Sequence, residues 1–310
     1  MSRKKAIVET ASEKAARVGQ KQRQFQRIRL DIPRQHDLVA AMEQLRMSGI
    51  DRIEGEGTRG LRVIQPSGTG KSESAKQIKA FVESQPGRDP TKQPVLHVSL
   101  DTTGTPRSAV ASCLEELGDE YTTDGNEGLL LKRLRMALKK EGVELLIIDE
   151  LNHCSGKTLG KDVSNTFKNM LTKGWAPIAF MGTSDADRLF KTNRELRNRC
   201  SPQLSLTPLD PEGSDLNEWV AFLKGMDEQI VARDLLPSRS DLAAVDVAEA
   251  LCIACGGVIG EVCLVIEDAL CAVLNRGDTT IAISDLHRAV EVRYVLEGDL
   301  DANPFDELVG

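Results

Sequence analysis

The sequence predicts an α/β protein in which a doubly wound parallel sheet of five strands is followed by a small all-helical domain. Short apolar runs alternate with longer amphipathic segments between residues 61 and 206, and only helical periodicity follows. Strands that alternate with helices pair in parallel, and a parallel sheet is covered by helices on both faces. The 310 residues, 40% of them hydrophobic, suffice for one large core and one smaller module.

The predicted elements follow one another in a regular order. A helix at 37–47, with Leu38, Met42 and Leu45 at helical spacing, and a glycine-broken loop at 49–60 precede the sheet. Buried strands are expected at 61–65, 94–100, 143–149, 177–182 and 203–206. Helices between them are expected at 71–83, 107–117, 129–140, 162–173 and 185–191, and helices after them at 215–233, 241–255, 259–274 and 284–296.

These patterns divide the chain into four parts. A basic N-terminal arm at 1–36 precedes an α/β domain at 37–210, which includes the leading helix. A helical domain follows at 211–296. The last segment, 297–310, is acidic and has too few apolar residues to pack alone, so we expect a tail.

Charge is distributed unevenly along the chain. The arm has ten Lys or Arg against three acids, a charge of +7. Because the net charge of the chain is −7, the remaining residues together carry −14. A basic arm on an acidic body favours contact with a polyanion, because cations near phosphates release condensed counterions. A solvated, partly disordered leader explains the arm equally well.

Composition also restricts the class of protein. No run approaches the roughly 18 apolar residues that a membrane span requires, and no apolar stretch follows the basic N-terminus, so we expect a soluble, cytoplasmic protein. Cys252 and Cys255 form a C-x-x-C, with Cys263 and Cys271 further on, but all four lie in apolar helical segments without a nearby histidine. This context favours core packing over zinc.

A glycine-rich segment joins the first strand to its helix, with the residues Gln65-Pro66-Ser67-Gly68-Thr69-Gly70-Lys71-Ser72. Glycines between a strand and a helix let backbone N–H groups surround a phosphate, to which the helix N-terminus adds positive charge. Lys71 is expected to reach the β- and γ-phosphates and Ser72 to bind Mg²⁺. Gln65 replaces the usual first glycine, which is tolerable where its backbone angles are ordinary.

An acidic pair, Asp149-Glu150, ends the apolar strand at 143–149. Ligands bind at the carboxyl ends of strands in such sheets, so Asp149 is expected near the phosphate loop, holding Mg²⁺. Glu150 is the candidate base for the attacking water, which favours a hydrolase over a small-molecule kinase. His153 fits either a supporting role in the site or a solvated loop.

Two further groups complete the candidate site. Thr183, with Ser184 as the second choice, follows the strand at 177–182, where a hydroxyl can sense the γ-phosphate or orient water. Arg194, Arg197 and Arg199 lie before the last strand, and an arginine there can reach the nucleotide of a neighbouring subunit. Arg199 is preferred over Arg197, although a solvated basic face is nearly as compatible with the pattern.

The order Ser-Gly-Thr-Gly-Lys-Ser, Ile-Ile-Asp-Glu, Gly-Thr-Ser and Arg-Asn-Arg-Cys resembles the AAA+ superfamily of P-loop ATPases. Within it, Leu-Leu-Ile-Ile-Asp-Glu-Leu-Asn-His and the Gly-Gly-Val-Ile-Gly-Glu of the helical domain resemble the TniB/TnsC transposition regulators, over roughly residues 35–296. The resemblance implies an ATPase, with ATP and Mg²⁺ as cofactors and a helical lid. It also implies a homo-oligomer, a ring or filament, that assembles on double-stranded DNA and links a target-selection protein to the transposase.

The chain departs from the superfamily pattern at two positions. Gly260 stands where many lids have a sensor arginine, so that role is not carried over. Cys200 replaces the usual aromatic after the finger arginine. By analogy with such oligomers, Arg107, Lys157 and Lys161 are candidates for a DNA-facing pore. Few aromatics accompany the basic residues, so contact with the DNA backbone is expected rather than base reading.

Three other functions remain as alternatives. A replication initiator or helicase loader predicts a C-terminal winged-helix domain, for which the 14 residues after Leu296 leave no room. A nucleotide-dependent signalling switch is disfavoured by the Asp149-Glu150 pair. A small-molecule kinase is disfavoured by the helical domain and the arginines at 194–199.

Overall fold

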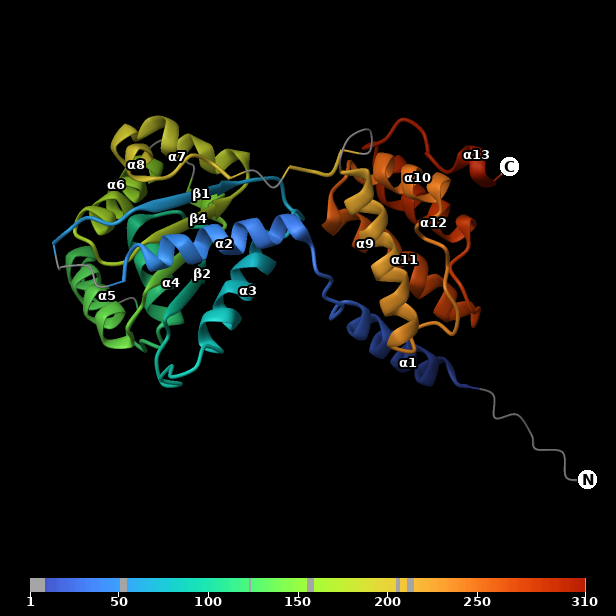
Figure 1. Ribbon diagram of the computed structural model, residues 1–310, viewed down its shortest axis with the longest axis horizontal. Coiled ribbons are helices and arrows are strands. Elements are labelled where there is room, and N and C mark those ends of the chain that lie inside the picture. Colours follow the sequence, from blue (N-terminus) through green and yellow to red (C-terminus); the bar gives the residue numbers. More distant parts are fainter. Residues whose placement is uncertain are drawn as a thin grey trace, which may run out of the picture. The chain divides into compact units, whose positions relative to one another are not determined.

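The computed structural model describes residues 9–50, 55–122, 124–154, 159–204, 207–210 and 215–309. It consists of two compact units, one formed by Pro33–Thr207 and the other by Met1–Ile32 together with Pro208–Gly310 (Figure 1). The boundary predicted at residue 36 therefore lies a few residues too late. The N-terminal segment belongs to the same unit as the C-terminal helices.

The first unit has a parallel sheet at its centre. Its strands are β1 (Gly60–Ile64), β2 (Val95–Ser99), β3 (Leu145–Asp149) and β4 (Ile178–Gly182), in the order β1-β4-β3-β2. Every residue of β3 and β4 is buried, which explains why these strands read as unbroken apolar runs. The parallel α/β architecture is confirmed.

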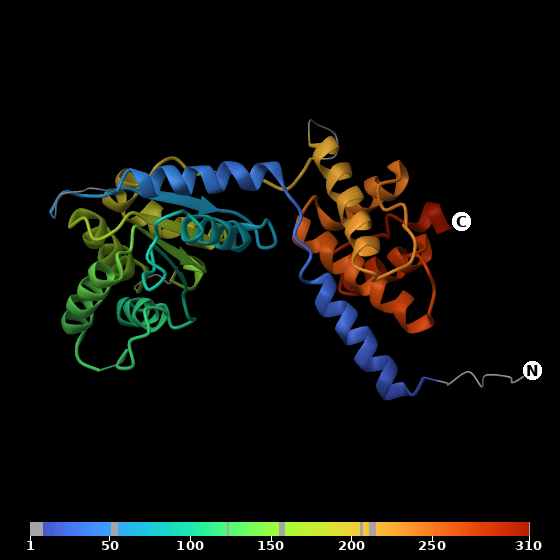
Figure 2. The same cartoon turned by 60° about the horizontal axis from the view of Figure 1, so that its bottom comes forward.

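Helices cover both faces of this sheet. On one face, α2 (Pro33–Met47) and α3 (Lys71–Glu83) share a core with residues such as Val63 and Ile147. The other face packs against α4 (Pro106–Glu116), α5 (Glu127–Glu141), α6 (Leu159–Thr172), α7 (Asp187–Thr192) and α8 (Arg194–Arg199). Figures 1 and 2 show α2 and β1 running alongside each other.

Among the described residues the sheet has four strands, so the prediction of a fifth at 203–206 was wrong. Cys200 forms an isolated bridge with Gly60, and the N–H of Ser201 donates to Gly60 O at 2.8 Å. The next backbone bond joins Leu204 N to Arg62 O at 3.1 Å. Three residues therefore advance along this segment while two advance along β1, and the intervening Pro202 has no N–H to donate. Residues 205–206 lie outside the described residues.

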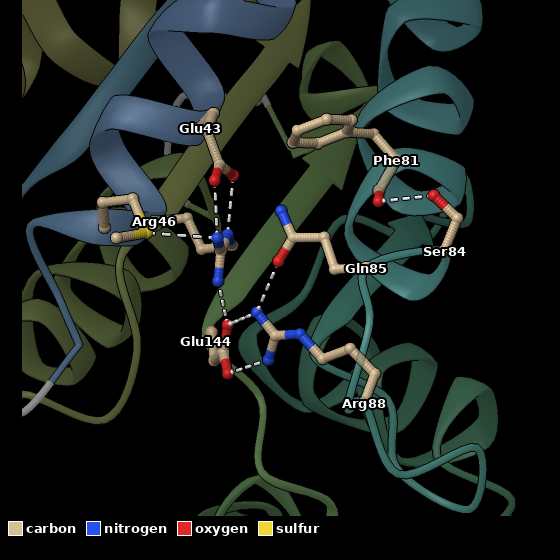
Figure 3. A network of polar contacts seen from close by, with 8 residues as sticks. Glu43, Arg46, Phe81, Ser84, Gln85, Arg88 and Glu144 are labelled. Carbon is tan, nitrogen blue, oxygen red and sulfur yellow. Dashed lines mark hydrogen bonds and ion pairs between the residues drawn. The ribbon is translucent and has the colours of Figure 1, made fainter.

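An ion-pair network fastens the end of α2 to the start of β3 (Figure 3). The Arg46 guanidinium bonds both carboxylate oxygens of Glu43 and also pairs with Glu144. Arg88 contacts Glu144 from the other side and reaches Gln85 at 3.2 Å. Two arginines and two glutamates thus neutralise one another beside the sheet.

The regular elements of the second unit, in its described residues, are all helical. Its elements are α1 (Ala11–Phe25), α9 (Leu216–Ala232), α10 (Val245–Cys255), α11 (Ile259–Arg276), α12 (Ile283–Val290), a π-helical turn at Glu291–Val295 and α13 (Asp306–Val309). They share one core that includes Trp219, Leu251 and Val265, and Cys252 and Cys255 are part of it. Within the described residues, no single helix is long and apolar enough to span a membrane; α10 and α11 reach that only as a pair bent by 115°.

The first and last described helical segments pack into this core. In α1, Val18 and Phe25 are buried, and Lys21 Nζ donates to the carbonyls of Asp234 and Leu235 at 2.9 Å. At the other end, Phe305 is fully buried and Asn303 Nδ2 donates to His287 O at 2.9 Å. The prediction that 297–310 is a tail was therefore wrong, because Phe305, together with the partly buried Leu300 and Leu308, packs against the core.

Candidate nucleotide-binding site

The loop between β1 and α3 has the backbone of a phosphate-binding turn. Gly68 and Gly70 have φ of 76° and 91°, a region that side chains disfavour. A Cβ on Gly70 would lie 2.2 Å from Gln35 Nε2, so the side chain of Gln35, from α2, would have to shift to admit any other residue there. Within the loop, Thr69 Oγ1 donates to Pro66 O at 3.0 Å, and Ser67 is exposed.

Gln65, at the position of the usual first glycine, fits the loop without strain. The positive-φ non-glycine residues of the described chain are Glu150, Asp234 and Asp241, so Gln65 has an ordinary backbone conformation. Its side-chain amide donates to Leu204 O at 3.0 Å. A glycine could not make this bond, which ties the beginning of the loop to the segment beside β1.

The ammonium group of Lys71 points into the loop. Lys71 Nζ donates to Gln65 O at 2.9 Å and to Pro66 O at 2.6 Å, and the residue is only 8% exposed. Burial lowers the pKa of Lys71, while the nearby carboxylates of Asp149 and Glu150 oppose that shift. Phosphate oxygens can replace the two carbonyl acceptors and supply the negative charge that this buried cation favours.

Ser72 and Asp149 meet at the carboxyl edge of the sheet, as the sequence predicts. Ser72 Oγ donates to Asp149 Oδ2 at 2.7 Å, and the N–H of Glu150 donates to Asp149 Oδ1 at 2.9 Å. Burial raises the pKa of Asp149, but hydrogen bonds from His97, Ser72 and that N–H outweigh it and hold the pKa below its usual value. An ionised carboxylate beside a hydroxyl is a donor set that Mg²⁺ accepts.

The histidine at this site is His97 of β2, whereas the sequence drew attention to His153. His97 Nε2 lies 3.3 Å from Asp149 Oδ2, while His153 Nδ1 contacts the Leu100 carbonyl at 3.0 Å. Because Ser99 is in register with Asp149, His97 lies on the same face two residues earlier. A polar residue inside an otherwise apolar strand is the signal that would have identified it.

Glu150 and Thr183 are joined by a third residue that the sequence did not single out. Glu150 has φ of 55°, and Asn152 Nδ2 donates to its Oε2 at 3.2 Å. The N–H of Thr183, which follows β4, donates to Asn152 Oδ1 at 3.3 Å. Ser184, the second choice for a sensor, begins the next turn and is exposed.

The arginines of α8 lie away from this cluster. Arg194 and Arg197 are exposed, and Arg199 is half-buried beside Gly57, where a Cβ would lie 3.1 Å from Arg199 Nη1. Gly57 precedes β1, whereas the phosphate loop follows it, so the length of the strand, about 16 Å, separates the two ends. Within one chain, Arg199 does not join Lys71 and Asp149.

The proposed pore residues are only partly described. Arg107 is exposed in the first turn of α4. Lys157 and the side chain of Lys161 lie outside the described residues.

The sheet order, the glycine loop after β1 and the acidic pair at the end of β3 define a P-loop nucleotide-binding fold of the AAA+ type. Solved structures with this fold include the Aeropyrum pernix ORC2 protein in ADPNP–ADP complexes, with a TM-score of 0.62 and 12% identity over 87% of this chain and 71% of that one. The Aeropyrum pernix ORC1 protein in complex with DNA has a TM-score of 0.63 and 14% identity, over 84% and 65% of the two chains. Cdc6p from Pyrobaculum aerophilum has a TM-score of 0.61 and 12% identity, over 84% and 68%.

The sequence itself identifies the family. Residues 29–206 match the model of the bacterial TniB protein, so the chain belongs to the TniB family. A search of curated protein sequences found no match.

Proposed function

We propose that this chain is an ATP-dependent regulator of DNA transposition, which assembles on target DNA and is released by ATP hydrolysis. The observation that carries the proposal is the 2.7 Å contact between Ser72 Oγ and Asp149 Oδ2, inside a TniB-family chain. It brings together the two candidate Mg²⁺ ligands from separate elements. The transposase and the target-selection protein, as partners, rest on the family resemblance.

Each residue of the proposed site has a separate role in ATP binding or hydrolysis. The loop N–H groups and Lys71 bind the phosphates of ATP, and Ser72 and Asp149 hold Mg²⁺. Mg²⁺ would neutralise charge developing on the transferred phosphoryl group. Glu150 accepts the proton of the attacking water, and Thr183 senses the γ-phosphate. Hydrolysis rather than switching is proposed because Glu150 follows Asp149 directly at the strand end.

Two elements of the proposal lie outside this cluster. Arg199 lies at the opposite end of β1 from the phosphate loop, so its proposed role is to reach the nucleotide of a neighbouring subunit. The helical unit serves as the lid. Contact with duplex DNA is proposed through exposed cations such as Arg23 and Arg27, which carry charge without reading bases.

A replication initiator or loader is the second candidate, since ORC and Cdc6 proteins share the fold at TM-scores of 0.61 to 0.63. At 12 to 14% identity that likeness concerns the fold alone. The two candidate functions differ in the sequence specificity of their DNA binding. An initiator selects particular sites, whereas the proposed regulator binds unrelated duplexes with similar affinity.

Electron microscopy of the protein on long duplex DNA of arbitrary sequence tests the proposal. Ordered assemblies around the DNA are expected with ATP and not with ADP. Lys71→Ala should prevent them, while Lys76→Ala, an exposed lysine of the same helix, should not. DNA binding that is equal with ATP, with ADP and without nucleotide would refute the proposed function. Strong preference for one sequence would favour the initiator.

A further inference from the structure

We propose that Asn152 is a positioning residue that links the candidate base Glu150 to the candidate sensor Thr183. This inference rests on the proposed function, because it concerns how Glu150 performs its part in hydrolysis. Asn152 lies in the short 3-10 turn Leu151–Cys154 that directly follows the acidic pair. Its side chain lies between the ends of β3 and β4, the strands that directly precede Glu150 and Thr183.

The chemistry of the three groups determines how the Asn152 amide is oriented. The carboxylate of Glu150 can only accept a hydrogen bond, so the NH₂ group must face it, at 3.2 Å. The backbone N–H of Thr183 can only donate, so the amide oxygen must face it, at 3.3 Å. Reversing the amide would break both bonds at once. A single planar group therefore has one arrangement in which both neighbours are satisfied.

Packing around Asn152 leaves it little freedom. A Cβ on Gly182 would lie 3.3 Å from both Asn152 N and Asn152 Oδ1, and 2.9 Å from Ala186 Cβ. The turn is also closed by the N–H of His153, which donates to Glu150 O at 3.0 Å. The absence of a side chain at Gly182 thus lets the turn after β3 press against the end of β4. Any shift of that end is passed to the amide.

Glu150 itself needs support. Its φ of 55° is unusual for a residue with a side chain, and such conformations persist where the surroundings hold them. A glutamate side chain that projects from a turn samples several rotamers unless a partner selects one. Asn152 binds Oε2, and the proposed role leaves Oε1 to accept from the attacking water. Misplacement of a catalytic group by about 1 Å costs on the order of 10²-fold in rate.

Through Asn152, a change at the sensor Thr183 can alter the position of the base Glu150. When the γ-phosphate contacts Thr183, displacement of its backbone moves the Asn152 oxygen, and the NH₂ group on the other side of the same amide re-aims Glu150. Asn152 itself has no proposed contact with ATP, because the phosphates contact the loop at 65–72 and the γ-phosphate contacts Thr183. Loss of the link should therefore lower kcat and leave the affinity for ATP nearly unchanged.

Substitution of Asn152 by two residues of different chemistry tests this role in the full-length protein. Asn152→Asp preserves the shape and the acceptor for Thr183 N–H, but places an oxygen opposite the Glu150 carboxylate. Asn152→Ala removes both bonds without adding charge. The expected result is a kcat about 10- to 100-fold below wild type for Asn152→Ala, lower still for Asn152→Asp, and a Kd for ATP within about 3-fold of wild type in both.

The order of the two variants separates positioning from packing. If Asn152 only filled space, the isosteric Asn152→Asp would be the milder change. Asn126→Asp, at the N-cap of α5, adds the same charge where aspartate caps equally well and should leave kcat unchanged. Bound ATP shows that each variant is folded.

The possible outcomes distinguish this inference from the proposed function. Wild-type kcat in both Asn152 variants, or Asn152→Asp more active than Asn152→Ala, would overturn the positioning role while Glu150→Gln remains inactive. A wild-type protein that releases no phosphate, or a Glu150→Gln variant that turns over normally, would instead refute the proposed hydrolysis and remove the basis of the inference.

Discussion

Arg46 and Glu144 form an ion pair that joins the end of α2 to the residue before β3, and only 1% of the Arg46 side chain is exposed. The same guanidinium is held by Glu43, and Arg88 contacts Glu144 from the α3–β2 connection. Because α2 also carries Gln35 against the phosphate loop, this pair helps to hold a helix that lies beside that loop.

Removal of Arg46 should destabilise the protein. Arg46→Ala leaves Glu43 without its cation, while Glu144 keeps Arg88. Because the two carboxylates are 24% and 25% exposed, we expect a loss below the roughly 3–5 kcal/mol of a fully buried pair. The free energy of unfolding in urea measures this. Lys140→Ala is the control, because Lys140 is 80% exposed and its pair with Glu141 contributes at most about 1 kcal/mol. Equal effects of the two substitutions would contradict the structural role of the network.

Glu144 should make stability depend on pH in the acid range. Burial raises its pKa, but hydrogen bonds from Arg88 and Arg46 outweigh this and hold the pKa below the usual 4.5. The folded carboxylate thus stays ionised where the unfolded one protonates. The contribution of Glu144 to the free energy of unfolding is complete at pH values above the usual pKa of 4.5. It is lost as the pH falls through the lower pKa of the folded state. Glu144→Gln should make the free energy of unfolding, measured in urea, depend less on pH in this range. An unchanged pH dependence would show that Glu144 does not contribute to it.

The sequence predicted the parts of this protein that local patterns determine. Glycines at 68 and 70, and the run of apolar residues that ends at Asp149, required no tertiary information. The fifth strand did, because Pro202 and one extra residue break its pairing with β1. His97 and Gln35 were missed because each reaches the site from a separate element whose approach depends on the whole fold. Asn152 follows Glu150 by only two residues, but its contact with Thr183 depends on how the turn packs against the end of β4.

The structure also changes how the basic arm should be tested. Deletion of residues 1–36 would expose the core contacts of Val18 and Phe25, so it would confound binding with folding. Arg23→Gln with Arg27→Gln alters two exposed charges of the same segment. We expect weaker binding to duplex DNA, with a salt slope lower by about 1 for each residue that contacts phosphate. An unchanged slope would show that these cations do not contact DNA.

Arg199 should act on a neighbouring subunit. Arg199→Ala is expected to preserve ATP binding and to lower kcat in the assembled state, by up to about 10³-fold if it behaves as an arginine finger. Arg197→Ala, on the same helix but fully on the surface, is the matched control. Mixing the Arg199→Ala protein with the Glu150→Gln protein should restore turnover. In mixed assemblies, some interfaces between subunits combine an intact Glu150 from one subunit with an intact Arg199 from its neighbour. Failure of the mixture to recover activity would argue against action in trans.

Phosphate release by Glu150→Gln, measured beside its affinity for ATP, tests the central claim most directly. The substitution keeps the shape of the side chain and removes its ability to accept a proton. We predict that Glu150→Gln binds ATP as tightly as wild type and releases phosphate about 10²- to 10⁴-fold more slowly. Turnover equal to that of wild type would contradict the assignment of this site as one that hydrolyses ATP through Glu150.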